Sequence, residues 1–239
     1  MILNRNLRRV GELAGRARRA LVVGAGHGPL NAATHVIDGG SYAEAAEPVD
    51  GQNSRRFFPA TWTQMDICAT PWPFPDKYFE FSFCSHVLED VRDPLAVLRE
   101  ISRVSRAGYI ETPSRAREIF VPARYPLLSA WLGRKPPVGF PHHRWYVENV
   151  QGQFRFLAKT AETIAAPDYV LTQRELGREL TDEESGLGVF WSDRIEGREL
   201  VFANSREISY ELRGFKQRIL YRLRSADARD ALTGGARAA

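Results

Sequence analysis

A closely spaced set of glycines, Gly24, Gly26 and Gly28, follows the short apolar segment 20–23. An apolar run of this length that ends in glycines is typical of a buried parallel strand. Glycine lets the backbone turn sharply and approach a ligand without a Cβ in the way. In an open parallel sheet, such a turn lies at the carboxyl ends of the strands, where ligands bind. A dinucleotide fingerprint needs a further small residue where this chain has Pro29, so the spacing favours a nucleoside site, with a plain strand–loop turn as the alternative.

Two carboxylates stand at the ends of the next two predicted strands. Asp38 ends the segment 34–38, where it can accept hydrogen bonds from both hydroxyls of a ribose. Asp66 lies near the end of the segment 62–67, where it can accept one from the exocyclic amine of an adenine. Either residue alone is more often a cap or a turn former. Because the carboxyl ends of parallel strands share one edge of a sheet, both carboxylates are expected beside the glycine turn.

Strand-like and helix-like segments alternate through the first half of the chain. Strands are predicted at 20–23, 34–38, 62–67, 79–84 and 109–112, and helices at 3–19 and 94–104. This alternation predicts an α/β fold with a Rossmann-like, doubly wound and mostly parallel sheet. In the second half, 147–166 has a helical tendency and 208–223 forms an amphipathic basic helix. The runs 189–191 and 199–202, with a turn through Gly197, predict a C-terminal antiparallel hairpin at the sheet edge.

Length and composition indicate one domain. A chain of 239 residues with 44% hydrophobic and 26% charged residues suits a single α/β core. The predicted division is a single domain over 1–225, with a lid or insertion at about 114–146, and a disordered tail over 226–239. No apolar stretch is long enough to span a membrane, and no apolar signal region follows the N-terminal arginines. Cys68 and Cys84 fit no disulfide or zinc spacing, so a cytoplasmic location is expected.

Several stretches together resemble the class I S-adenosylmethionine-dependent methyltransferases that carry the type 11 methyltransferase domain. The resemblance covers roughly the first half of the chain, to about residue 114. It rests on the stretches 21–28, 66–67, 72–80, 85–91, 93–94 and 98–104. It implies a seven-stranded Rossmann-like sheet with S-adenosylmethionine bound across the strand ends.

The resemblance also implies roles by position. Ser85 and His86 would line the pocket where methyl transfer occurs, and Ser85 would also contact the cofactor. The other cofactor contacts would be Gly24, Gly26 and Gly28 at the turn, Asp38 at the ribose, and Asp66 with Ile67 at the adenine. Two departures concern the amino-acid end of the cofactor: Val22 stands where the family has an acid, and the connection from 28 to 38 is short. They motivate an alternative, a non-catalytic nucleoside-binding or interaction domain with the methyltransferase fold.

Methyl transfer to an alcohol needs a base within hydrogen-bond reach of the hydroxyl. Glu89 and Asp90 are candidates, but the predicted catalytic residues are His86, His142, His143 and Glu111. The imidazoles are attractive because histidine titrates near neutral pH. Each has an alternative interpretation. His86 could only shape the pocket, His142 and His143 could be a loop pair beside Trp145, and Glu111 could pair with Arg115 or Arg117.

A metal site on His86, Glu89 and Asp90 is a further alternative, since these side chains could share one face. A mixed nitrogen and oxygen set suits Mg²⁺ only partly, and the sequence therefore predicts no metal.

The acceptor is inferred mainly by exclusion. Amino-methylation of adenine or cytosine usually has an Asn/Asp-Pro-Pro-aromatic turn after the fourth strand, and this chain has Ser-His-Val-Leu at 85–88. Cytosine C5 chemistry needs a cysteine that follows a proline, and neither cysteine does. A small-molecule or glycan acceptor, methylated on oxygen, is expected, and nucleic acid is disfavoured. The net charge of +4 and the pI near 9.2 come from arginines, some of which lie in the terminal helices. Such basic helices leave peripheral contact with a membrane open. The sequence does not indicate an oligomeric state.

Overall fold

The computed structural model describes residues 3–26, 28–45, 56–122, 139–160 and 169–234. Its main sheet has the strand order β3-β2-β1-β4-β5-β10. The strands are β1 (Ala20–Val23), β2 (His35–Asp38), β3 (Trp62–Gln64), β4 (Phe81–Ser85), β5 (Ala107–Pro113) and β10 (Gly186–Ser192). The first five are parallel and β10 is antiparallel to β5, which confirms the doubly wound, mostly parallel sheet. The resemblance implied seven strands, and the described residues form six in this sheet.

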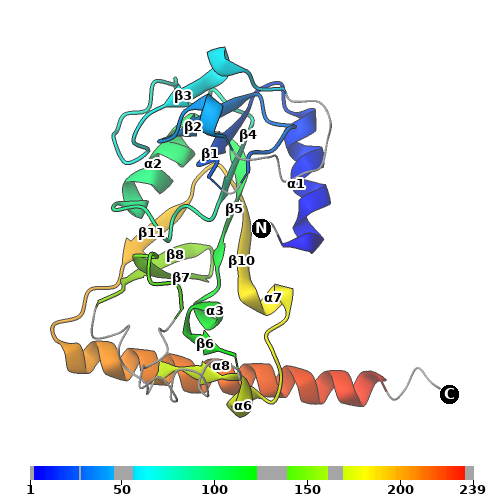
Figure 1. Cartoon of the computed structure of the whole chain (residues 1–239), viewed down its shortest axis with the longest axis vertical. Coiled ribbons are helices and arrows are strands. Elements are labelled where there is room, and N and C mark those ends of the chain that lie inside the picture. The colour runs from blue at the N-terminus through cyan, green and yellow to red at the C-terminus, as the bar shows by residue number, and fades with distance from the viewer. Residues whose placement is uncertain (1–2, 27, 46–55, 123–138, 161–168, 235–239) are drawn as a thin grey trace.

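Two helices cover the two faces of this sheet, α1 (Asn4–Arg16) and α2 (Pro94–Val104) (Figure 1). Successive strand side chains point to opposite faces. Leu21 and Val23 accordingly pack with the apolar face of α2, while Ala20 and Val22 pack with the buried residues of α1. Both faces are buried, as expected for parallel strands whose sequences read as continuous apolar runs.

The start of α2 follows from its sequence. The carboxylate of Asp93 accepts a hydrogen bond from the backbone N–H of Ala96 (2.8 Å), and Pro94 occupies the first turn, where no intrahelical donor is lost. The buried stripe includes Val97, Leu98 and Ile101. The helix α2 thus connects the turn after β4 to β5 and buries its apolar stripe in the core.

A second, three-stranded sheet lies below α2 in the view of Figure 1, and its presence contradicts two predictions made from the sequence. Its strands are β7 (Trp145–Val150), β8 (Gln153–Ala158) and β11 (Glu196–Glu199), in the order β11-β8-β7. The helical tendency predicted for 147–166 is therefore wrong over the described part of that range. Gln151 and Gly152 both have positive φ (54° and 86°), the conformation of a tight hairpin turn, and Phe154 and Phe156 alternate into the core.

The predicted C-terminal antiparallel hairpin is also wrong. β10 does lie antiparallel at the edge of the main sheet, but β11 pairs in parallel with β8. Hydrogen bonds hold the chain between them against α2, including one from the backbone N–H of Ile195 to the hydroxyl of Ser102 (2.9 Å). Gly197 is no turn residue: a Cβ there would lie 2.7 Å from Cδ1 of Leu98, so glycine permits β11 to pack closely on α2.

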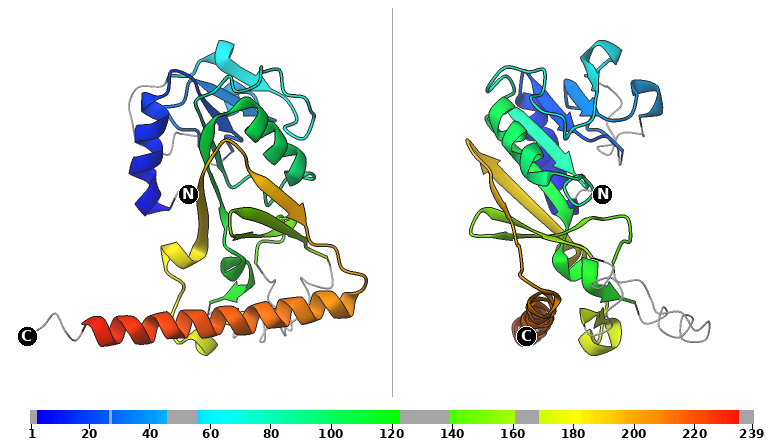
Figure 2. Two further views of the ribbon diagram at one scale, coloured as in Figure 1. Left: turned by 180° about the vertical axis from the view of Figure 1, so that it is seen from behind. Right: turned by 90° about the vertical axis from the view of Figure 1, so that its left-hand side faces the viewer.

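The long helix α8 (Ser205–Gly234) crosses one end of the molecule (Figure 2). Short elements link it to the rest: α3 (Arg115–Ile119), β6 (Phe120–Val121), β9 (Leu171–Thr172), α6 (Gln173–Leu176) and α7 (Asp182–Ser185). The predicted apolar face of α8 packs into this part, with Leu212 and Leu223 buried. The helix continues to Gly234, into the segment 226–239 that was predicted as a tail. Over 123–138, the lid prediction lies outside the described residues.

Two 3₁₀ turns, η1 (Tyr42–Glu44) and η2 (Pro59–Thr61), complete the described elements. Among the described helices, none is long and apolar enough to cross a membrane.

Arg56 ties the end of α1 to the segment that precedes β2. Its Nη1 donates to the carbonyl oxygens of Ala14 (3.2 Å), Gly15 (3.1 Å) and Ala32 (2.9 Å), and its Nη2 donates to that of Ala17 (3.0 Å). These carbonyls include ones that α1 leaves without intrahelical partners at its C-terminus.

We predict that Arg56→Ala lowers the free energy of unfolding by about 2 kcal/mol, because charge-assisted hydrogen bonds to helix-end carbonyls are lost. Urea denaturation followed by circular dichroism measures the change. Arg99→Ala, on the exposed face of α2, is the matched control and should stay within about 0.5 kcal/mol of the parent. Equal stabilities of the two variants would contradict the role of Arg56.

Candidate active site

The glycine turn packs directly on the turn that follows β4. Gly24 has φ +73°, and a Cβ at this position would lie 2.3 Å from Cγ2 of Val87. Gly28 also has a positive φ (102°), and its backbone N–H donates to the carbonyl of Ala25 (2.9 Å). At Gly26, no atom of the described residues beyond its chain neighbours lies within 4 Å of the Cβ position, so these residues leave open space beside the turn. The cofactor roles of these glycines stay predictions, and their conformation suits a close approach of backbone to ligand.

Asp38 lies at the end of β2 and holds the glycine turn. Its Oδ2 accepts a hydrogen bond from the backbone N–H of Ala25 (2.5 Å), and its Oδ1 accepts one from Gly40 (2.6 Å). A carboxylate oxygen has two lone pairs, so each oxygen can accept one more hydrogen bond from a ribose hydroxyl. The structure thus places Asp38 beside the turn, and its ribose contact stays a prediction.

Asp66 follows β3 at the same edge of the sheet. Its carboxylate contacts Nη1 of Arg92 (2.5 Å) and accepts a hydrogen bond from the backbone N–H of Cys68 (2.9 Å). The hydrogen bond from Arg92 lowers the pKa of Asp66, so this half-exposed group is a carboxylate at neutral pH. The carbonyl of Ile67 accepts from the indole of Trp72 (2.9 Å). The adenine contacts assigned to Asp66 and Ile67 remain predictions.

Val22 lies fully buried on the α1 side of β1. It packs there with Val10 and Ala14 of α1. The chain therefore has no acid at this position to receive the amino group of a cofactor's amino-acid end.

His86 lies between two buried carboxylates. Ser85 ends β4 opposite Glu111 of β5, and the backbone N–H of His86 (φ 54°) donates to the carbonyl of Glu111 (2.9 Å). Its Nδ1 is 3.1 Å from Oε1 of Glu89, and its Nε2 is 3.7 Å from Oε1 of Glu111. The imidazole is 21% exposed, while both carboxylates are 1% exposed. An imidazole in this position can take up a proton and have its charge stabilised.

Glu111 is held from the other side by the N-terminal segment. The backbone N–H of Leu3 donates to both of its oxygens (3.1 and 2.9 Å), and the hydroxyl of Tyr109 donates to Oε2. Burial raises the pKa of Glu111, and the hydrogen bonds from Tyr109 and Leu3 oppose the rise. The alternative pairing of Glu111 with Arg115 is wrong: Arg115 contacts Glu148 (3.1 Å) instead, and also Glu211 (3.2 Å).

His142 and His143 form a second group with Asp90. The two imidazole centroids are 4.4 Å apart, and Nε2 of His143 is 3.9 Å from Oδ1 of Asp90. Nδ1 of His143 lies 2.5 Å from Oε1 of Glu118, whose other oxygen contacts the ammonium of Lys159. Burial by itself raises the pKa of Glu118, but the His143 hydrogen bond and the Lys159 charge outweigh it and hold the pKa below its ordinary value.

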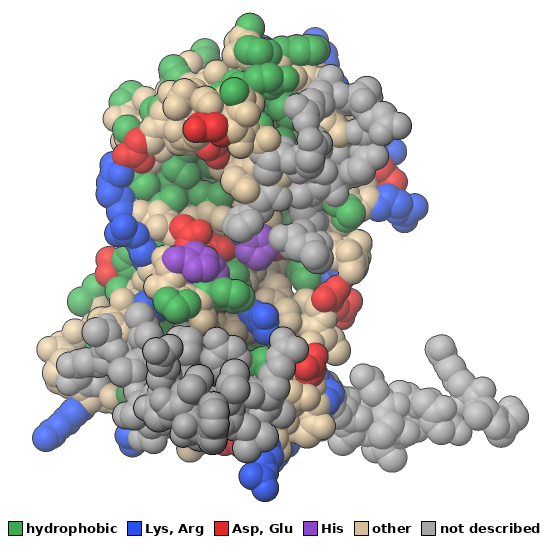
Figure 3. Space-filling view, viewed as in Figure 1, with side chains coloured by type: hydrophobic (Ala, Val, Ile, Leu, Met, Phe, Trp, Pro, Cys, Tyr) green, Lys and Arg blue, Asp and Glu red, His purple; other side chains and the backbone are tan. Residues whose placement is uncertain are grey.

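The two groups meet at the turn after β4. The carbonyl of Glu89 accepts hydrogen bonds from the backbone N–H groups of Arg144 (2.6 Å) and Trp145 (3.1 Å), so the start of β7 lies against this turn. The indole of Trp145 donates to the carbonyl of Val91 (2.8 Å). All four predicted base candidates therefore lie on or against residues 85–91 or the neighbouring strand β5. Figure 3 shows histidine and acidic side chains gathered on one face.

Sequence reasoning missed Glu118 and Lys159. Both side chains are 1% exposed. Glu118 lies on the short helix α3 and Lys159 follows β8, and no local pattern marks either one. Only a contact map could have paired residues 41 positions apart.

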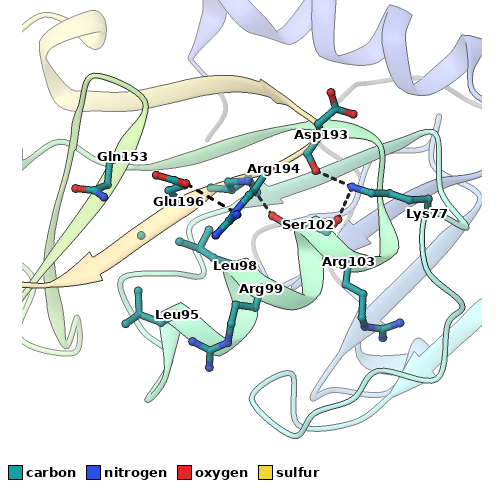
Figure 4. A pocket seen from close by; sticks show the side chains of 12 residues that line it. Lys77, Leu95, Leu98, Arg99, Ser102, Arg103, Gln153, Asp193, Arg194 and Glu196 are labelled. Carbon is teal, nitrogen blue, oxygen red and sulfur yellow. Dashed lines mark hydrogen bonds and ion pairs between the residues drawn. The ribbon is translucent and has the colours of Figure 1, made fainter.

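A cavity of about 610 Å³ lies elsewhere, between α2 and the segment after β10 (Figure 4). The ammonium of Lys77 closes one side of it by donating to the carbonyls of Ser102 (2.7 Å) and Asp193 (2.6 Å). None of its lining residues belongs to the glycine turn or to 85–91. This cavity is therefore separate from the candidate active site.

The strand order and the mostly parallel sheet agree with a Rossmann-like methyltransferase fold. Residues 21–110, less than half of the 239-residue chain, match the family described as "Methyltransferase domain". The cofactor of this class is S-adenosylmethionine.

Solved structures with local similarity include three proteins. The cyclase SpnF is 22% identical over 46% of this chain and 45% of its own, with a TM-score of 0.35. An S-adenosylmethionine-dependent methyltransferase from Mesorhizobium loti is 17% identical over 65% and 62%, with a TM-score of 0.35. The N-terminal domain of EvdMO1, in the presence of SAH and D-fucose, is 16% identical over 80% and 67%, with a TM-score of 0.34.

The chain thus spans from about half to about two thirds of the length of these proteins. No curated protein matches it. The class assignment depends on the strand order and the family match.

We predict that Gly24→Ala lowers the free energy of unfolding by about 2–4 kcal/mol, from a positive φ and a clash with Val87. Gly26→Ala is the matched control, since its Cβ would meet open space. Denaturant titration of both variants checks the difference. A Gly24 variant as stable as the Gly26 variant would refute the close packing of the two turns.

We predict that Glu118→Gln destabilises the protein by about 3–5 kcal/mol at pH 7, because a buried ammonium loses its partner. The folded pKa of Glu118 is lowered, so its contribution is present above the pKa of an unfolded glutamate and is lost as the pH falls through the folded value. The difference from the parent should therefore shrink below about pH 4.5. Thermal unfolding at several pH values measures it, with the exposed Glu12→Gln as control.

Proposed function

We propose that this chain is an S-adenosylmethionine-dependent methyltransferase that acts on an oxygen of a small molecule or glycan. One observation carries the proposal: the glycine turn packs on Val87, the neighbour in sequence of His86. The backbone that would hold the cofactor and the side chains that could activate an acceptor therefore share one edge of the sheet. Residues 21–110, which match the methyltransferase family, include both turns.

The bound cofactor supplies an electrophilic methyl group, so the protein mainly has to align the acceptor and remove its proton. Nε2 of His86 would take the proton of the acceptor hydroxyl, and the oxygen would accept the methyl group as the bond between that carbon and the cofactor's sulfur breaks. Glu89, 3.1 Å from Nδ1, orients the ring and stabilises the imidazolium that results. Glu111, on the other side, holds the backbone N–H of His86 through its carbonyl.

A hydroxylated acceptor agrees with the polar character of this edge. Histidines and carboxylates surround the turn after β4, and an oxygen acceptor needs the base that they supply. His142 is exposed and His143 is buried beside it, so the first can contact an acceptor that enters from solvent. Peripheral membrane contact through the arginines of α1 stays a prediction.

A second candidate is a domain that binds the nucleoside without turnover. Val22 favours it, because this buried aliphatic residue replaces the family's acid. The two functions differ in turnover only, since both require cofactor binding.

Asp38→Ala should weaken binding of S-adenosylmethionine at least about 10-fold, through loss of the ribose contact and a looser glycine turn. Isothermal titration measures the dissociation constant, with Asp76→Ala, which removes an exposed carboxylate outside the site, as control. An unchanged constant would refute the ribose assignment.

His86→Gln should lower methyl transfer about 100-fold or more while cofactor affinity changes less than about 3-fold. Transfer of a labelled methyl group from the cofactor into a metabolite or glycan extract provides the assay. A parent protein that binds the cofactor but labels nothing supports the non-catalytic candidate, and no cofactor binding at millimolar concentration contradicts both functions.

A further inference from the structure

Asp90, His142 and His143 come from two segments, yet their side chains converge. One ligand atom from each lies within 4.8 Å of the others, and Nε2 of His143 is 3.9 Å from Oδ1 of Asp90. No metal was predicted from the sequence, because only the local set of His86, Glu89 and Asp90 was recognisable there. The convergence depends on the hydrogen bonds that fix the start of β7 against the turn after β4.

A second observation concerns the orientation of His143. Its Nδ1 lies 2.5 Å from Oε1 of Glu118, a carboxylate that is 1% exposed. Metal-binding histidines commonly donate their other ring N–H to a carboxylate, which sets the tautomer and directs the lone pair of the free nitrogen at the metal. Nδ1 is thus committed to Glu118, and Nε2 is the atom that faces Asp90.

Local charges also suit a cation. The ammonium of Lys159 lies nearby, but it contacts Glu118 and donates to the carbonyl of Phe140 (3.2 Å). Glu118 therefore compensates the Lys159 charge. On the other side, Glu89 is buried next to Asp90 in the chain, and its Oε2 has no hydrogen-bond partner among the described residues. An unsatisfied buried carboxylate oxygen raises the negative potential at this turn.

We propose that Asp90, His142 and His143 bind a divalent transition-metal ion, with zinc the best match. Two imidazoles and one carboxylate form a three-ligand set of the kind that catalytic zinc sites use, with a further position left for water or substrate. Such nitrogen donors favour zinc, cobalt or nickel over Mg²⁺, which prefers oxygen. Donors of one tetrahedral zinc ion lie roughly 3.3 Å apart, so binding would draw these three side chains slightly together.

A role of this ion in catalysis depends on the methyltransferase function proposed above. Binding of the ion by the three side chains does not depend on that function. Asp90 is adjacent in the chain to Glu89, whose Oε1 lies 3.1 Å from Nδ1 of His86, so an ion held by Asp90 would lie at the same turn as the proposed base. A hydroxyl bound there would lose its proton more readily, because the ion stabilises the alkoxide. The metal would thus select acceptors with an oxygen that can reach it and His86 together.

The test is Co²⁺ titration of the full chain, with visible absorption as the readout and Zn²⁺ in competition. We expect one Co²⁺ per chain, displaced by Zn²⁺ and not by Mg²⁺ at millimolar concentration. His142→Ala should lower the Co²⁺ affinity at least about 30-fold, and because His142 is exposed the variant should fold as the parent does. Asp90→Asn should also weaken binding.

His86→Gln is the matched control, since it removes a histidine outside the proposed ligand set and should keep the parent's Co²⁺ affinity. Parent protein without Co²⁺ binding, or equal affinities in His142→Ala and parent, would overturn the metal site. Cofactor titration of the same preparations separates the two proposals. Co²⁺ binding without cofactor binding would leave the metal site standing and refute the methyltransferase function.

Discussion

Close packing between the glycine turn and the turn after β4 is the constraint on which the candidate active site depends. The two turns follow neighbouring parallel strands, β1 and β4, so their backbones emerge at the same edge of the sheet. Val87 occupies the space that a side chain at Gly24 would need. Because both turns are held this closely, the predicted cofactor turn and the polar side chains that begin at His86 form one continuous edge.

A second layer of interactions sets the acceptor side. The start of β7 hydrogen-bonds to the carbonyl of Glu89, and this contact brings His143 next to Asp90. Glu118 and Lys159 support the arrangement as a buried ion pair, which is costly to leave half-formed. The part of the chain that follows β5 therefore supplies His142, His143 and the carboxylate of Glu118 that contacts one of them.

Much of the first half could be predicted because local patterns there agree with the tertiary fold. Short apolar runs bounded by glycine gave the parallel strands, and Asp93 with Pro94 marked the start of α2. The second half was harder. Residues 147–158 were assigned a helical tendency, and the Gln151-Gly152 turn shows why they form a hairpin instead. Gly197 was interpreted as a turn, but it permits a strand to approach α2.

The sequence by itself determined the glycine turn, the two strand-end acids, the doubly wound sheet and the identities of the candidate bases. These features depend on residue type and on spacing along a single strand or helix. Tertiary structure alone decided that Glu111 lies beside His86, that Glu118 contacts His143, and that Asp90 meets two histidines more than 50 positions away. The physical reason is that such pairs form only when separate segments pack, and packing follows from burial of the apolar face of each segment rather than from the polar residues that it brings together.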